Sequence, residues 1–133
     1  MTEWRGEIRL DLSDAEGRIL SLISSVSGEL TEGQIRSIWK SYVDIEKSVA
    51  FIRVEMAEEN PGRFVKPRKY FVPDERQALQ FALRNLRKGS ESFALGDLKR
   101  SLSELREARN YLRVILIAKR RMKTRRARAA PTR

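Results

Sequence analysis

The sequence contains no cysteine and no histidine. Without cysteine there are no disulfides and no thiolate metal sites, so a reducing cytoplasm is the expected location. Without histidine the commonest general base and a common metal ligand are missing as well. No glycine-rich phosphate loop or activated nucleophile is recognisable either. The sequence therefore predicts a protein that is not an enzyme and that holds no metal or cofactor.

Long hydrophobic runs are also absent. The longest uninterrupted apolar run covers residues 114–118, which is far short of the roughly 18 to 20 residues needed to span a bilayer. The first residues lack the hydrophobic stretch of a secretion signal. A chain of 133 residues has the usual size of one domain. We therefore expect a soluble single-domain protein with no membrane span.

Positive charge is concentrated at one end of the chain. The sequence has 28 basic and 18 acidic residues, and from residue 119 onward there are eight basic residues and no acid, which leaves 20 basic against 18 acidic in residues 1–118. We divide the chain accordingly into a bundle domain, 1–118, and a basic C-terminal extension, 119–133. Such an end favours a polyanion partner: nucleic acid, DNA or RNA, first, and an anionic membrane surface second. A solubilising tail without a partner is the alternative.

The predicted contacts in this extension are Lys119, Arg120, Arg121, Lys123, Arg125, Arg126 and Arg128. Arginine outnumbers lysine 20 to 8 in the chain, a composition that would suit a thermophilic or GC-rich source.

Apolar residues at gaps of three and four predict four helices, at residues 14–26, 32–57, 75–93 and 98–126. The second has the most regular pattern: Ile35, Ile38, Tyr42, Ile45, Val49, Ile52 and Met56. Its start is marked by Thr31 and Gln34, which have the spacing of a capping box, and Ser13 with Glu16 has the same spacing before the first helix. Asp74 can cap the third helix, and Gly96-Asp97 can end it and begin the fourth. The predicted fold class is an all-α four-helix bundle.

Residues 3–12 show a different pattern, an alternation that is typical of a half-buried strand. Trp4, Ile8, Leu10 and Leu12 fall on one side and charged residues on the other. The pattern predicts a short N-terminal strand. It would either pair with residues 64–72 or form an ordered arm without a partner.

Residues 60–73 contain three of the four prolines, which predicts a long extended connection. Its basic residues Arg63, Lys66, Arg68 and Lys69 alternate with aromatic ones, among them Tyr70. Cations can contact phosphates while a ring such as that of Tyr70 stacks on a base. Alternatively, Phe64 and Phe71 anchor this connection to the core.

In two helices the apolar residues cover a wider face than the narrow stripe that packing against one neighbouring helix requires. Trp39, Phe51 and Val54 widen the second helix, either as core or as a seam for a partner helix. In the fourth helix, the predicted partner interface is Tyr111, Val114, Leu116 and Ile117. If the bundle leaves such residues exposed, a homodimer or a complex with other protein subunits follows.

Two short segments resemble known families. Residues 104–112, Glu-Leu-Arg-Glu-Ala-Arg-Asn-Tyr-Leu, lead on to Arg120-Arg121-Met122-Lys123, and this stretch resembles the closing helix of the helical domain of archaeal GINS replication-complex subunits. Residues 30–36, Leu-Thr-Glu-Gly-Gln-Ile-Arg, resemble a helix start in the small helical subunit of type III CRISPR effector complexes. Both resemblances imply a small non-catalytic helical subunit of a nucleic-acid machine.

The sequence thus favours a non-catalytic accessory subunit that binds nucleic acid or docks within a replication or RNA-guided defence complex. The alternative is a helical protein–protein interaction module whose basic tail only improves solubility.

Overall fold

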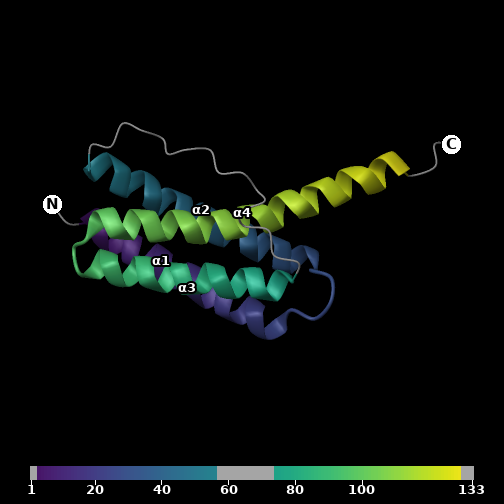
Figure 1. The fold of residues 1–133 in the computed structure, drawn as a ribbon, viewed down its shortest axis with the longest axis horizontal. Helices are drawn as coiled ribbons and strands as arrows, with labels where there is room; N and C mark the ends of the chain where they lie inside the picture. The colour runs from purple at the N-terminus through teal and green to yellow at the C-terminus, as the bar shows by residue number, and fades with distance from the viewer. Residues whose placement is uncertain (1–2, 57–73, 130–133) are drawn as a thin grey trace.

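The computed structural model describes residues 3–56 and 74–129, with side chains for residues 4–56 and 74–120. Within these ranges the chain forms four helices and no strand: α1 (Glu3–Ser25), α2 (Glu32–Glu55), α3 (Glu75–Ala94) and α4 (Leu98–Ala129). Figure 1 shows them packed side by side as a bundle. The predicted all-α four-helix fold is confirmed, and the bounds of α2, α3 and α4 lie within three residues of the predicted ones.

The predicted helix starts are explained by their capping groups. The amide of Gln34 donates to the Thr31 hydroxyl at 3.1 Å, and the Thr31 amide donates to the Gln34 side chain at 2.9 Å, which completes the capping box. Asp74 accepts from the amide of Arg76 at 3.0 Å before α3. Gly96 takes a φ of 80° between α3 and α4, a left-handed conformation that glycine adopts without strain.

The predicted N-terminal strand is wrong, because residues 3–12 are the first half of α1. Ile8 and Leu12 begin a helical series that continues through Ala15, Ile19 and Leu22, all buried. Leu10, which completed the apparent alternation, is 68% exposed. A helix satisfies its backbone hydrogen bonds within the segment, whereas a strand needs a neighbour. The capping box expected at Ser13 and Glu16 is also wrong, since both lie inside α1; the strand partner proposed at 64–72 lies outside the described residues.

The four helices occupy the corners of a square. α1 packs against α2 and α3, and α4 packs against α2 and α3, so α1 and α4 lie on one diagonal and α2 and α3 on the other. The ion pairs Glu7–Lys47 and Arg18–Asp44 show that α1 and α2 are antiparallel. Trp4 meets Phe93 edge to face at 6.0 Å and Glu16 meets Arg87, which shows that α1 and α3 are antiparallel as well. α2 and α3 therefore run parallel, although they are consecutive in the chain.

The packing is tightest between α3 and α4. A Cβ added at Gly89 would lie 2.6 Å from Leu105 Cδ2 and 3.3 Å from its backbone nitrogen. Ser101 donates its hydroxyl to the Gly89 carbonyl at 2.7 Å. Since Leu105 is fully buried, it has no free space to move into. The absence of a side chain at residue 89 is thus what allows the two helices to approach this closely.

The outer side of α2 carries exposed hydrophobic residues. The predicted series from Ile38 to Ile52 faces the core, but Trp39, Phe51 and Val54 are 54%, 38% and 79% exposed. The interpretation that these three widen the core is wrong. They lie on the far side of the helix from Ile45, because positions six and nine residues apart are turned well away from it.

Candidate nucleic-acid interface

α4 continues beyond the bundle as a single helix. Its 32 residues end at Ala129, and its last turns project past the ends of the other three helices (Figure 1). The apolar face ends with Ile115, which is buried, and Leu116, which packs against the core. The basic residues from 119 to 128 therefore belong to an extension of a core helix, which runs three residues beyond the predicted end at 126.

Lys119 marks the point where α4 leaves the bundle. Its ammonium lies 2.9 Å from Glu75 Oε1, and the two side chains are only 13% and 28% exposed. Glu75 is the first residue of α3, where an acid also interacts favourably with the helix dipole. Lys119 is therefore held by α3. Its acidic partner lies 44 residues away in the sequence, so no local pattern reveals the pair.

Of the other predicted phosphate contacts on α4, the structure describes the side chain of one and the backbone of the rest. Arg120 is exposed. Arg121, Lys123, Arg125, Arg126 and Arg128 lie on the helical backbone that ends at Ala129, and their side chains are not described. At 100° per residue these positions are distributed around the helix axis and do not lie on one face. The predicted loop contacts, Arg63, Lys66, Arg68, Lys69 and Tyr70, lie outside the described residues.

The predicted partner interface on α4 is largely engaged within the bundle. Tyr111 stacks on Phe81 of α3 with ring centroids 5.3 Å apart, and Leu116 packs against the core. Val114 and Ile117 are half-buried. All four residues of this predicted interface are thus half-buried. Among the described residues, the exposed large hydrophobic side chains lie mainly on α1 and α2.

Ion pairs connect every neighbouring pair of helices. Arg18 of α1 meets Asp44 of α2 at 2.5 Å, and Arg87 of α3 meets Glu16 of α1 at 2.7 Å. The pairs Arg109–Glu46 and Lys119–Glu75, the latter described above, join α4 to α2 and to α3. These contacts neutralise much of the charge on the bundle's sides, which leaves the α4 extension as the largest block of cations without acids in its own sequence.

The charge that remains on the bundle is unevenly divided between its two hairpins. Residues 1–56 contain 7 basic and 10 acidic residues, a net charge of −3, whereas residues 74–118 contain 9 basic and 6 acidic residues, a net charge of +3. The α3–α4 hairpin thus has the same sign as the extension that it carries. Sequence reasoning missed this division, because it treated residues 1–118 as one nearly neutral body.

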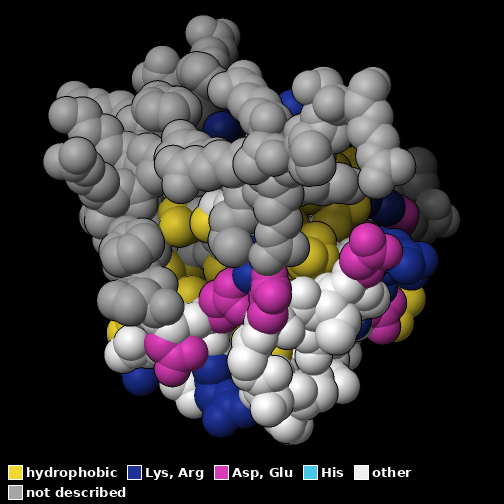
Figure 2. Space-filling model, turned by 90° about the vertical axis from the view of Figure 1, so that its right-hand side faces the viewer, with side chains coloured by type: hydrophobic (Ala, Val, Ile, Leu, Met, Phe, Trp, Pro, Cys, Tyr) yellow, Lys and Arg dark blue, Asp and Glu magenta, His cyan; other side chains and the backbone are white. Residues whose placement is uncertain are grey.

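An acidic cleft lies at the end of the bundle from which α4 projects. It has a volume of about 530 Å³ and is lined by Val26, Ser27, Gly28 and Glu29 of the α1–α2 connection and by Asp74, Glu75 and Arg76 at the start of α3. The Arg76 guanidinium donates to the Val26 carbonyl and ties the two segments together. In Figure 2, which looks onto this end, acidic side chains stand beside hydrophobic ones. Three carboxylates here disfavour phosphate binding within the cleft itself.

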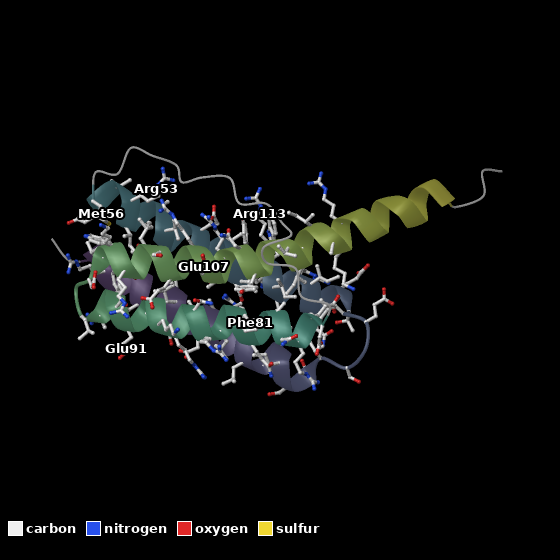
Figure 3. All side chains as sticks on the ribbon, in the orientation of Figure 1. Arg53, Met56, Phe81, Glu91, Glu107 and Arg113 are labelled. Atoms are coloured by element: carbon white, nitrogen blue, oxygen red, sulfur yellow. The ribbon has the colours of Figure 1, made fainter. Side chains whose placement is uncertain are left out.

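The solvent face of α3 carries a group of cations that sequence reasoning also missed. A shallow depression of about 370 Å³ is lined by Gln80, Leu83, Arg84, Arg87, Lys88 and Glu91. Arg84 lies over the Phe81 ring at 5.6 Å, and in Figure 3 Glu91 points away from the bundle. The signal was present in the sequence: Arg84 and Lys88 are four residues apart and fall opposite the predicted apolar face of α3.

Within residues 4–56 and 74–120, no three acidic side chains come close enough together to hold a metal ion. Burial and the neighbouring Glu46 raise the pKa of Tyr42, and Arg113 and Arg109 act in the opposite direction. None of the helices, over the part of the chain that the structure describes, is long and apolar enough to cross a membrane.

No protein-family model, curated protein or solved structure matches this chain.

Proposed function

We propose that this protein is a non-catalytic helical subunit that binds the phosphate backbone of nucleic acid through the basic end of α4. The observation that carries the proposal is the continuity of α4, which passes from the buried Leu112 and Ile115 to the cations after Lys119 without a break in the helix. A helical extension presents its charges at fixed spacing, so fewer degrees of freedom are lost on binding than with a disordered tail. The Lys119–Glu75 pair fixes where it leaves the bundle.

We propose, second, that the protein acts as a subunit of a larger complex. The resemblance of residues 104–123 to archaeal GINS subunits, and of residues 30–36 to a type III CRISPR subunit, points to small helical components of replication or RNA-guided defence assemblies. The phosphate backbone is common to DNA and RNA, so the chemistry of α4 suits either. Cytoplasmic location, expected from the lack of cysteine, is consistent with both settings.

The test is to remove the charge and keep the helix. Changing Arg121, Lys123, Arg125, Arg126 and Arg128 to alanine preserves helix propensity, since alanine is the best helix former. We expect binding to duplex and single-stranded oligonucleotides to weaken for all sequences alike. The slope of log affinity against log salt should flatten by about 0.7 to 0.9 for each phosphate that the variant no longer neutralises.

Fluorescence anisotropy at several salt concentrations measures both quantities. The melting temperature serves as the control and should not change, because the core ends before these positions. If the intact protein does not bind either oligonucleotide at low salt, the proposal fails.

A protein interaction module is the second candidate, and the exposed side of α2 favours it. Trp39, Val43, Phe51 and Val54 are all more than a third exposed on one helix, and Trp39 stacks on Tyr42 with centroids 5.6 Å apart. Exposed groups of large hydrophobic residues are typical of protein interfaces. The two candidates use different helices, so a subunit could dock through α2 and bind nucleic acid through α4.

A further inference from the structure

The solvent face of α3 begins at the end of the bundle from which the α4 extension projects. Glu75, at the start of α3, pairs with Lys119 of α4, so the two basic segments begin at the same end of the bundle, although the solvent face of α3 is turned away from Glu75. Along α3, the exposed side chains Gln77, Gln80, Arg84 and Lys88 recur at gaps of three and four. They form one stripe of hydrogen-bond donors, which runs about 16 Å along the helix.

Two of the three cations that line the depression on α3 are oriented by the bundle. Arg87 is held by Glu16 of α1 at 2.7 Å. Arg84 rests over the ring of Phe81, which is itself stacked on Tyr111. Lys88 is exposed and has no ion-pair partner among the described residues. Two anchored guanidiniums and one unpaired ammonium therefore line the same shallow depression.

We propose that this face of α3 is a second phosphate-binding surface, on which nucleic acid bound by the α4 extension continues along the bundle. The inference rests on the proposed function and assigns it a defined site. Each strand of a duplex carries a phosphate about every 3.4 Å along the axis, so about 16 Å of helix faces four or five phosphates. Arginine donates two parallel hydrogen bonds to phosphate, and lysine contributes a point charge.

Charge favours α3 over the half of the bundle formed by α1 and α2. Residues 75–94 contain 4 basic and 2 acidic residues, a net charge of +2, whereas the net charge of residues 1–56 is −3. The outer side of α2 exposes Trp39 and Val54, and the cleft at the end of the bundle holds three carboxylates. Glu91 is the one acid that lines the depression on α3, and it should weaken phosphate binding there.

The test compares two matched double variants. Arg84→Gln with Lys88→Gln removes two cations from α3, and Arg36→Gln with Lys40→Gln removes the same two residue types, at the same four-residue spacing, from the exposed side of α2. α2 and α3 lie on opposite corners of the bundle. Both variants have the same net charge, so only the position of the removed charge differs.

We expect the α3 variant to bind duplex DNA about tenfold more weakly at about 0.1 M salt, with a salt slope flatter by about 1.8 because two fewer phosphates are neutralised. The α2 variant should keep the slope of the unmodified protein. Glu91→Gln should strengthen binding. Circular dichroism melting curves check that all three variants remain folded.

The outcomes separate the two proposals. If the intact protein binds DNA but the α3 and α2 variants weaken it equally, the α3 surface is wrong and the role of the α4 extension stands. If the intact protein binds no nucleic acid, both proposals fall. If Glu91→Gln does not change the affinity, or lowers it, the phosphate path does not pass this end of α3.

Discussion

The α1–α2 hairpin exposes hydrophobic side chains, whereas the α3–α4 hairpin exposes cations. Leu10, Leu20, Trp39, Val43, Phe51 and Val54 are exposed on the first hairpin, and among the large hydrophobic residues described in the second only Leu95, at the end of α3, is comparably exposed. The net charges of the two halves have opposite signs. The surfaces proposed for protein docking and for nucleic-acid binding therefore lie on different sides of one molecule, so the two proposals can be tested separately.

The two hairpins also differ in what their helical glycines contact. α3 and α4 meet at Gly89, where an added Cβ would overlap Leu105. On α1, Gly17 is exposed with nothing within 4 Å of such a Cβ. Glycine is thus needed for close packing at residue 89 of α3, whereas at residue 17 of α1 it has no packing role.

Exchanging these two glycines for alanine gives the largest expected effect on stability. Gly89→Ala should lower the free energy of unfolding by about 1 kcal/mol, since overpacking costs about 1 to 3 kcal/mol and alanine returns about 1 kcal/mol of helix propensity. Gly17→Ala should raise it by about 1 kcal/mol. Urea denaturation of both variants would measure the difference. Equal effects would mean that the α3–α4 contact is looser than its geometry indicates.

A second experiment asks whether the exposed side of α2 is a protein interface. Trp39→Gln with Val54→Glu changes exposed residues, so the free energy of unfolding should stay within about 0.5 kcal/mol of its original value. If α2 mediates self-association, the unmodified protein should be a homodimer by light scattering and the variant a monomer. Ala50→Ser, an exposed change on the same helix, is the control. A monomer in both cases would exclude the homodimer and leave other subunits as partners of this face.

The smallest expected effect concerns alkaline pH and the α2–α4 contact. Burial and Glu46 raise the pKa of Tyr42, so above the usual tyrosine pKa of about 10 the unfolded chain loses its proton before the folded protein does. The contribution of neutral Tyr42 to the free energy of unfolding is therefore fully present below pH ~10. It is lost as the pH rises through the pKa of Tyr42 in the folded protein. Tyr42→Phe should make the free energy of unfolding fall less steeply above pH ~10.

The hydrogen bond to Glu7 raises the pKa of Lys47 in the folded protein. The stability that this contact contributes is therefore also lost as the pH rises through the folded-state pKa of Lys47. The Lys47 side chain is exposed, and it remains in the Tyr42→Phe variant, so it serves as an internal reference for the comparison. If the free energy of unfolding of the variant falls as steeply above pH ~10 as that of the unmodified protein, Tyr42 ionises as freely in the folded state as in the unfolded chain.

Local interactions explain why much of the fold could be predicted. The series from Ile35 to Met56 and the caps at Thr31 and Asp74 act within a few residues, so they can be read from sequence alone. The error at residues 3–12 has the opposite cause. In this segment the apolar residues fit two patterns: an every-second-residue alternation that includes Leu10, and a helical spacing that includes Ile8 and Leu12. Only the packing of Ile8 and Leu12 against other helices decides between a strand and a helix.

The sequence by itself determined the four helices, the absence of thiol and imidazole chemistry, and the block of cations after residue 118. The tertiary structure alone decided which charges are opposed, since Lys119 meets Glu75 and Arg87 meets Glu16 across distances in sequence that no local pattern spans. It also decided that Trp39 faces solvent. The physical reason is that burial and charge pairing depend on which helix faces lie together, whereas helix formation depends largely on neighbouring residues.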